Sequence, residues 1–279
     1  MVKILADSLN VATGDRITTF ELKMPKCLLA ELNTHRMLSK NAGSSRAIPI
    51  KKVIERIKED PYIPQFTKHQ KGMQGEIGDR IFQVSAKHLW MKQLDAAIQT
   101  ALDMEQLGVH KQNANRVLEP WMYVPVIVTG TEWSNFFNLR CAEPTHPDLR
   151  AIAREMKRQY DENEFKHLYP GEWHIPFSDG LMDRNQFKFR DALKIATARS
   201  ARISYATHDG VFDYDRDFGL HDRLLEEEHK SPFECSARAV TSKSEYPEYS
   251  YLNAGTLVNT RNYRGWLSYR AHLEQNIDV

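Results

Sequence analysis

The chain has 279 residues, of which 41% are hydrophobic and 27% are charged, and its formal net charge is +1. This composition is ordinary for a globular protein with one domain spanning residues 1–279. A nearly neutral chain lacks the broad basic surface that binds nucleic acid or anionic lipid, so a bound anion must be held by a local cluster of donors. No stretch approaches the roughly 20 apolar residues of a membrane span.

The cysteines are Cys27, Cys141 and Cys235. Their spacing fits neither a disulfide framework nor a metal site, so we expect no metal. Sparse thiols favour a reducing environment, which predicts a cytoplasmic location.

The hydrophobic pattern predicts a mixed α+β fold rather than a doubly wound parallel sheet. Alternation and β-branched runs predict strands at residues 2–9, 17–23, 124–128 and 236–242. The first two form a hairpin around Thr13-Gly14-Asp15. Apolar spacing of three to four residues predicts helices at 25–35, 54–59, 77–107, 133–139, 148–160, 191–203 and 218–228. The helix at 77–107 is the longest and should be amphipathic.

The segment from Thr34 to Arg46 concentrates polar side chains. His35 and Ser39 are four residues apart and would share a helix face. After them we expect a loop over residues 41–46, where hydroxyls, backbone N–H groups and a guanidinium could hold a phosphate. The alternative is an ordinary polar helix end, with basic residues placed at the negative end of the helix dipole.

A second cluster runs from His229 to Glu234. Pro232 ends the preceding helix, and His229, Ser231 and Glu234 present polar groups where the chain leaves it. Taken alone, this pattern is also typical of a helix terminus without a function.

A third cluster combines Arg116–Pro120 with Asn135–Arg140. Arg140 follows an apolar segment, so its charge could enter a partly buried site and stabilise an anion there. The alternative is a core helix that ends in a surface arginine.

Together these clusters resemble the flavin-dependent thymidylate synthases, the ThyX family. The long family motif Arg-His-Arg-x-x-Ser-x-Asn-x-x-Ser-x-Arg stands at residues 34–46 with Thr34 in the first place. Four further elements resemble His-x-Ser/Thr-Pro-Phe-Glu-His, Arg-x-x-Leu-Pro, Asn-Phe-Leu-x-Leu-Arg and Ala-Arg-Val-Ser, and they lie at His229–Cys235, Arg116–Pro120, Asn135–Arg140 and Ala201–Ser204.

The order of these elements differs from the common one. The elements at 201–204 and 229–235 follow the long motif here, whereas they precede it in most of the family. The chain therefore resembles circularly permuted, phage-type members, and folds tolerate such permutation when the termini are close. The resemblance implies a ThyX-like α+β fold with a central, largely antiparallel sheet flanked by long helices.

The resemblance also implies an activity. Family members transfer a one-carbon unit from methylenetetrahydrofolate to C5 of dUMP and give dTMP, with FAD as cofactor and NADPH as reductant. The cofactor carries the difficult chemistry, and the protein orients the partners. The family forms homotetramers with active sites shared between subunits, and a phage-encoded member would work in the host cytoplasm.

Matched positions suggest roles for individual residues. Arg140 is the expected catalytic residue, because a guanidinium can favour the ionised N3 of the pyrimidine. The expected substrate-binding residues are Glu31, Ser44, Ser45, Arg46, Arg116 and Arg140. The expected flavin-binding residues are His35, Arg36, Ser39, Asn41, Asn135, Ser204, His229, Ser231 and Glu234.

Three departures from the family pattern leave alternatives open. Thr34 replaces an arginine, Ala42 a glutamate and Glu31 a glutamine. A carboxylate at Glu31 could accept a hydrogen bond from the cytosine amine but faces an acceptor oxygen in uracil, so dCMP is an alternative substrate and hydroxymethylation an alternative outcome. A homologue that binds FAD or nucleotide without turnover is a further alternative.

A single-stranded nucleic-acid binder would use exposed aromatic residues such as Trp121, Tyr123 and Trp133. The near-neutral charge argues against it, because neutralising a phosphate backbone needs many cations. Aromatic residues at these spacings are more often part of a core.

Overall fold

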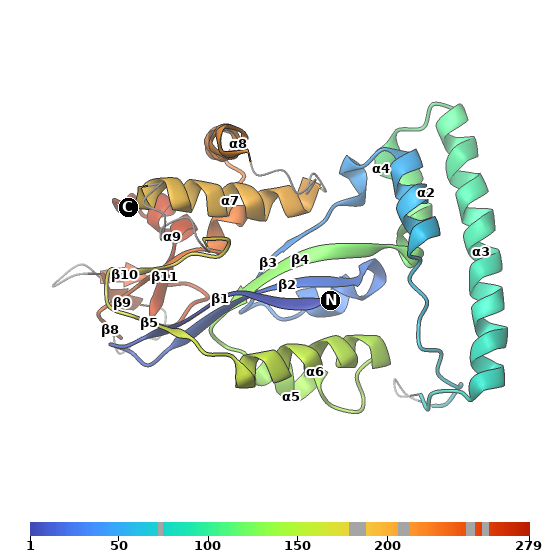
Figure 1. Cartoon of the computed structure of the whole chain (residues 1–279), viewed down its shortest axis with the longest axis horizontal. Helices are drawn as coiled ribbons and strands as arrows, with labels where there is room; N and C mark the ends of the chain where they lie inside the picture. The colour runs from blue at the N-terminus through green and yellow to red at the C-terminus, as the bar shows by residue number, and fades with distance from the viewer. Residues whose placement is uncertain (72–74, 179–187, 206–212, 244–248, 253–256) are drawn as a thin grey trace.

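The fold is mixed α+β and is built around a five-stranded central sheet (Figure 1). A computed structural model describes residues 1–71, 75–178, 188–205, 213–243, 249–252 and 257–279. The strand order is β3-β4-β2-β1-β5, with β1 at Val2–Asn10, β2 at Arg16–Pro25, β3 at Ser39–Ala42, β4 at Tyr123–Gly130 and β5 at Lys166–Leu168. Within this sheet β1 and β5 are parallel and the other pairs antiparallel, which confirms the largely antiparallel sheet.

Helices cover both faces of the central sheet (Figure 1). On one face lie α5 (Ser134–Arg140) and α6 (Pro147–Glu162). They pack on alternate residues of β2 and β4, namely Phe20, Leu22, Met24, Val124, Val126 and Val128. On the other face α7 (Phe189–Tyr205) packs on β3 and β4, and α8 (Tyr214–Glu226) lies on α7. Because the central strands are buried on both faces, the sequence of β4 is almost continuously apolar.

A helical arm extends beyond one end of β2 and β4 (Figure 1). It consists of α2 (Ile50–Glu59), α3 (Arg80–Gln106), α4 (Lys111–Ala114) and the 3-10 helix η3 (Asn115–Trp121). Its core contains Ile54, Ile57, Leu94, Ile98 and Trp121. None of the described helices is both long and apolar enough to span a membrane.

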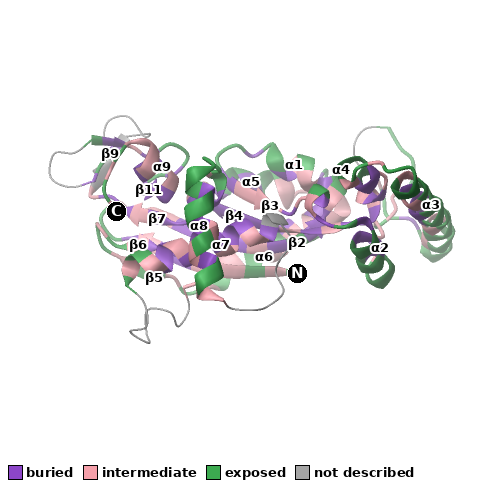
Figure 2. Cartoon of the chain, turned by 90° about the horizontal axis from the view of Figure 1, so that it is seen from above, coloured by how far each residue is buried: buried purple, intermediate pink, exposed green. Residues whose placement is uncertain are grey.

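The long helix predicted at 77–107 is confirmed as α3, but its predicted apolar stripe is only partly buried. Leu94 and Ile98 lie in the arm core, whereas Ile81 and Val84 are 80% and 62% exposed. The outer side of α3 is correspondingly exposed in Figure 2. The reason is geometric: α2 and η3 pack on the later part of α3, and the first turns extend beyond them.

The C-terminal part adds two small sheets, of strand order β11-β7-β6 and β10-β9-β8. The predicted strand at 236–242 is divided between them as β7 (Ala237–Ala239) and β8 (Ser242–Lys243). The remaining strands are β6 (Trp173–His174), β9 (Tyr249–Tyr251), β10 (Leu257–Asn259) and β11 (Trp266–Ser268). The remaining helical segments are η1 (Lys26–Leu28), α1 (Leu29–Asn33), η2 (Ser45–Ala47), η4 (Ser231–Glu234) and α9 (Tyr269–Glu274).

Two local predictions in the long motif are wrong. The helix expected at 25–35 ends at Asn33, so His35 lies in the turn that follows it. The loop expected at 41–46 begins as a strand, because β3 pairs with β4 from Ser39 to Ala42. A polar segment forms this strand since β4 offers it an unpaired edge of backbone donors and acceptors.

The aromatic residues considered for nucleic-acid stacking belong mainly to the interior. Trp121 and Trp133 are buried, and Tyr123 is half-buried. Trp133 packs edge-on to Phe20 of β2 at 5.1 Å between ring centroids. Buried rings cannot stack on bases, so this observation favours the core interpretation.

A buried polar network crosses the sheets at His174. The Ser8 hydroxyl lies 3.0 Å from Nδ1 of His174, and the Thr19 hydroxyl lies 2.9 Å from Nε2. Thr19 in turn bonds the Thr129 hydroxyl at 2.8 Å. Burial, with a smaller contribution from Lys166, lowers the pKa of His174 to about 3. The folded protein therefore holds this histidine neutral.

We predict that acid destabilises the fold through this histidine. Its folded pKa lies below the unfolded value of about 6.5, so between the two the unfolded state binds more protons. Stability should be greatest above pH 6.5 and should fall as the pH drops, by up to about 1.4 kcal/mol per pH unit for one such proton. Urea unfolding from pH 7.5 to 5 measures this slope. His174→Gln should flatten it and the exposed His69→Gln should not, so equal slopes in the wild type and His174→Gln would contradict the prediction.

Candidate active site

Arg140 ends α5 and is held by the turn that follows α1. Its Nε donates to Nε2 of His35 at 2.8 Å. Its Nη2 donates to the Thr34 hydroxyl at 3.0 Å and to the Glu31 carbonyl at 3.2 Å. The Glu31 carboxylate lies 3.7 Å from Nη1, and the Arg140 side chain is 20% exposed. The guanidinium is thus fixed in orientation while part of it faces solvent.

His35 is the neutral partner of this arginine. Burial lowers its pKa to about 4, and the charges of Arg140 and Lys40 add to the effect. Its ring meets Phe136 edge-on, with 5.0 Å between the centroids. Because Nε2 accepts from Arg140, the neutral ring must carry its proton on Nδ1. The positive charge at this place therefore belongs to Arg140.

A pocket of about 300 Å³ opens beside this pair. Arg36, Asn135 and Arg264 line it together with His35 and Arg140. Arg264 is anchored by an ion pair with Glu132 at 3.1 Å, and Arg36 is exposed. Guanidinium groups gathered around one cavity suit a ligand that carries phosphate or another delocalised negative charge.

A second pocket, of about 270 Å³, surrounds Glu234. The Ser39 hydroxyl donates to one carboxylate oxygen of Glu234, and Arg270 lies 2.7 Å from the other. The Tyr263 hydroxyl donates to the Glu234 carbonyl at 2.7 Å. The contact between Ser39 and Glu234 brings together the first and second predicted clusters, which the sequence separates by 195 positions.

Both pockets border the segment 260–264 that precedes β11. Arg264 lines the first pocket, and Thr260 to Tyr263 line the second. The Asn262 side chain donates to the carbonyl of Arg36 at 3.2 Å, which ties this segment to the long motif. The two pockets are therefore neighbours that share one wall.

The expected phosphate-binding residues lie elsewhere, beyond the far end of β3. Ser39 and Ser44 are five residues apart along an extended chain, or about 16 Å at roughly 3.3 Å per residue. Ser44 caps η2, its hydroxyl accepting from the backbone N–H of Arg46 at 3.3 Å, and the Arg46 side chain is exposed. Ser44 and Arg46 thus lie well away from Ser39 and the Glu234 pocket within one chain.

Ser45 and Arg116 are both engaged by the same carboxylate. The buried Ser45 hydroxyl donates to Glu119 at 2.6 Å, and Arg116 contacts the same oxygen at 3.3 Å. Asn115 supports this arrangement by donating to the carbonyls of Ser45 and Ile48. These contacts stabilise the segment after β3, and Glu119 competes with any anion there.

The other predicted flavin residues are dispersed. His229 is 57% exposed and lies 3.5 Å from Glu227, and Ser231 is exposed at the start of η4. Asn41 donates to the carbonyl of Ser200, which joins β3 to α7. Ser204 belongs to α7, but its side chain lies outside the described residues.

Sequence reasoning missed the basic residues of the C-terminal segment. Arg261, Arg264 and Arg270 border the two pockets, although no motif marked them. A signal was present, since arginines recur within ten residues around Gly265. The backbone is also special here, because Arg261 has φ of 57° and Gly265 has φ of 73°. Left-handed residues other than glycine are uncommon and concentrate at functional sites.

Within the described part of the chain, no group of three or more His, Cys, Asp or Glu side chains is placed to hold a metal ion. The donors at both pockets are mainly guanidinium, hydroxyl and amide groups. Such groups suit an anionic organic ligand.

Comparison with known families gives one match. The family model described as thymidylate synthase complementing protein matches residues 17–163, just over half of the chain. The match includes Glu31, the long motif, Arg116 and Arg140, and it ends before Glu234. The search of curated proteins gives no match.

Among solved structures, one similar chain is the UMP/dUMP methylase PolB from Streptomyces cacaoi, bound with 5-Br UMP. The similarity covers 61% of this chain and 90% of that chain, at 17% sequence identity and a TM-score of 0.47.

We predict that Gly265 sets the position of the segment 260–264. A Cβ at Gly265 would collide with the Asp15 carboxylate and the Thr13 hydroxyl of the β1–β2 turn. Gly265→Ala should therefore lower the free energy of unfolding by roughly 3 kcal/mol or more, through backbone strain and overpacking. Gly14 is the matched control, because it has φ of 71° and open space around the Cβ position. Gly14→Ala should cost only about 1–2 kcal/mol. Equal losses in urea unfolding would show that the β1–β2 turn does not constrain this segment.

Proposed function

The chain belongs to the thymidylate synthase complementing protein family, and from this premise we propose that it is a flavin-dependent thymidylate synthase. The proposed reaction transfers a one-carbon unit from methylenetetrahydrofolate to C5 of dUMP and, with NADPH as reductant, gives dTMP. The observation that carries the proposal is the contact between Arg140 and neutral His35 beside a pocket lined by further arginines.

Arg140 has the properties that activation of a pyrimidine requires. Its guanidinium is fixed by three acceptors and keeps a partly exposed edge. A fixed positive charge beside the ring favours the N3-ionised pyrimidine, which is richer in electrons at C5. The protein needs no reorganisation at the moment of reaction, because neighbours of Arg140 already hold it in place.

The pockets fit an anionic dinucleotide cofactor such as FAD. Arg36 and Arg264 would hold its diphosphate, because guanidinium groups bind phosphate oxygens in pairs. Ser39, Asn135 and Glu234 offer hydroxyl, amide and carboxylate partners for its polar groups. When bound, reduced FAD supplies the hydride that completes the methyl group. His229 and Ser231 are exposed where η4 begins, and in this proposal they complete the flavin site.

Glu31 decides between two substrates. Its carboxylate lies beside Arg140 and accepts hydrogen bonds without donating any. It could accept from the amine of cytosine, whereas it faces an acceptor oxygen of uracil. The Arg140 guanidinium, 3.7 Å away, gives this carboxylate a cationic partner within the protein, so it does not need the cytosine amine, which supports dUMP as the substrate. A C5 hydroxymethylase acting on dUMP or dCMP is the second candidate.

The test measures flavin content and turnover together. The purified wild type should show an oxidised flavin absorption band and should convert dUMP to dTMP, with the product mass recorded for dUMP and dCMP. Arg140→Ala should keep the flavin band and lose most turnover, roughly a hundredfold or more, because the lost charge acts on the nucleotide. Arg154→Ala is the matched control, since Arg154 is an exposed arginine of α6 that pairs with Glu143.

Each result has a separate meaning. A colourless wild type that takes up no added FAD would refute the flavin proposal. A yellow protein that binds dUMP and makes no product would identify a homologue without turnover. Undiminished turnover in Arg140→Ala would remove the role given to Arg140.

The proposal includes a homotetramer with shared active sites. Supporting it, Ile81, Val84 and Leu89 of α3 are exposed, and such a group of large apolar side chains favours contact with another protein surface. The separation of Ser44 from Ser39 and Glu234 within one chain also fits a site completed by a second copy.

We predict that charges on α3 weaken this assembly. The double variant Ile81→Glu/Val84→Glu should have a lower mass than the wild type in sedimentation equilibrium, because carboxylates oppose burial of this surface. Lys87→Glu, an exposed substitution on the same helix, is the control for added negative charge. An unchanged mass in the double variant would place the subunit contacts elsewhere.

A further inference from the structure

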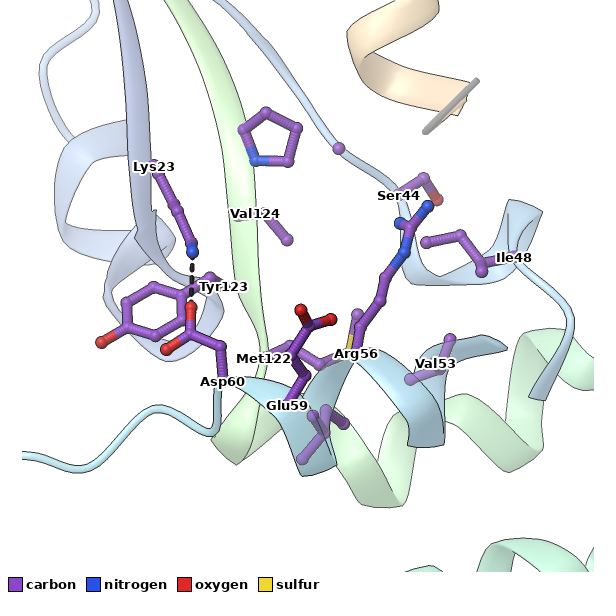
Figure 3. Close-up of a pocket in the computed structure, with 13 residues that line it drawn as sticks. Lys23, Ser44, Ile48, Val53, Arg56, Glu59, Asp60, Met122, Tyr123 and Val124 are labelled. Carbon is purple, nitrogen blue, oxygen red and sulfur yellow. Dashed lines mark hydrogen bonds and ion pairs between the residues drawn. The ribbon is translucent and has the colours of Figure 1, made fainter. Parts of the chain in front are cut away.

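A pocket of about 380 Å³ lies between α2, the start of β4 and the segment that follows β3 (Figure 3). We call it the α2 pocket. Its apolar wall consists of Ile48, Val53, Ile57, Met122, Val124 and Pro125. Ser44 stands at its edge, so the α2 pocket adjoins the part of the long motif expected to bind phosphate. It is separate from the two pockets around Arg140 and Glu234.

The charges in the α2 pocket are unevenly compensated. The Lys23 ammonium pairs with Asp60, so those two charges largely cancel. Arg56 has no hydrogen-bond or ion-pair partner for its side chain among the described residues. Figure 3 shows the Arg56 guanidinium extending toward Ser44, away from the carboxylate of Glu59. The end of the pocket near Ser44 is therefore cationic.

The backbone at Ser44 is fixed against the pocket wall. The N–H of Gly43 donates to the Pro125 carbonyl at 2.8 Å, and a Cβ on Gly43 would lie 3.0 Å from Cδ of Pro125. The Ser44 oxygen accepts from the N–H of Arg46, and its own O–H has no acceptor among the described residues. The Ser44 hydroxyl and the Arg56 guanidinium therefore lie near one another at the pocket edge (Figure 3).

This arrangement differs from that of Ser45 and Arg116, which share the carboxylate of Glu119. An anion binding to those two residues would have to displace Glu119. Arg56 and Ser44 impose no such cost, since their donors are available.

The geometry points to Arg56 as a further substrate-binding residue, which holds the 5′-phosphate of the pyrimidine nucleotide together with Ser44. The inference rests on the proposed function, in which a second copy completes the site and brings its Arg140 to the base, and adds to it the place of the phosphate. A phosphate monoester offers several acceptor oxygens, which match the Arg56 fork and the Ser44 hydroxyl. The apolar wall beside them suits the uncharged sugar.

The test compares nucleotides with and without the phosphate. Binding of dUMP and of deoxyuridine to the full-length purified protein is measured by calorimetry. Arg56→Ala should weaken dUMP binding by about tenfold or more, the usual effect of losing a charged hydrogen bond, and should leave deoxyuridine binding unchanged. Arg56→Lys should recover part of the loss, because it keeps the charge without the fork. Lys52→Ala is the matched control, an exposed cation of α2 outside the pocket.

Three results would overturn the inference. Wild-type affinity for dUMP in Arg56→Ala removes Arg56 from the phosphate site, and wild-type turnover of dUMP would still support the proposed function. Equal losses for dUMP and deoxyuridine show that Arg56 acts through the structure of α2 and not through the phosphate. A wild type that binds neither dUMP nor deoxyuridine overturns both proposals.

Discussion

Arg140 is held in one orientation at the edge of a buried environment because the histidine ring beside it is neutral. Burial and the charges around His35 lower the pKa of that histidine to about 4, so the ring accepts a hydrogen bond from the guanidinium and does not repel it. A protonated His35 would place two cations 2.8 Å apart and would have no free acceptor. The orientation of Arg140, and with it the first pocket, depends on this one neutral ring.

β3 runs between the Glu234 pocket and the α2 pocket. Its first residue, Ser39, contacts Glu234 from the C-terminal part, and Ser44 lies just past its last residue beside the α2 pocket. The strand exists because β4 offers it a free edge, and Asn41 fastens it to α7. The pairing of one short, polar strand therefore sets the distance between the Glu234 pocket and the α2 pocket.

The sequence predicted those features that depend on neighbours in the chain. The β1–β2 hairpin and the long helix α3 follow from local patterns and are confirmed. The strand at 39–42 could not be predicted, since its polar residues are extended only because β4 is there. The exposure of Ile81 could not be predicted from the sequence either. Periodicity shows that a helix has an apolar stripe, but it does not show whether another part of the chain covers that stripe. Ser39 and Glu234, which the motifs assigned to one predicted site, are in contact, but nothing local linked the segment 260–264 to them.

The α2 pocket and the Glu234 pocket differ in how the chain builds them. Ser44 and Arg56 are twelve residues apart and are placed by local elements, η2 and α2. The Glu234 pocket requires contacts across much of the chain, including the bonds of Asn10 to Gly265 and of Trp266 to Asp15 that hold β11 against the β1–β2 hairpin. Contacts of such sequence separation cost more loop-closure entropy than local ones. The geometry of the Glu234 pocket therefore depends more on the complete fold than that of the α2 pocket. A ligand that bridges Ser39 and Arg264 would stabilise the folded state, because it would bind across these long-range contacts.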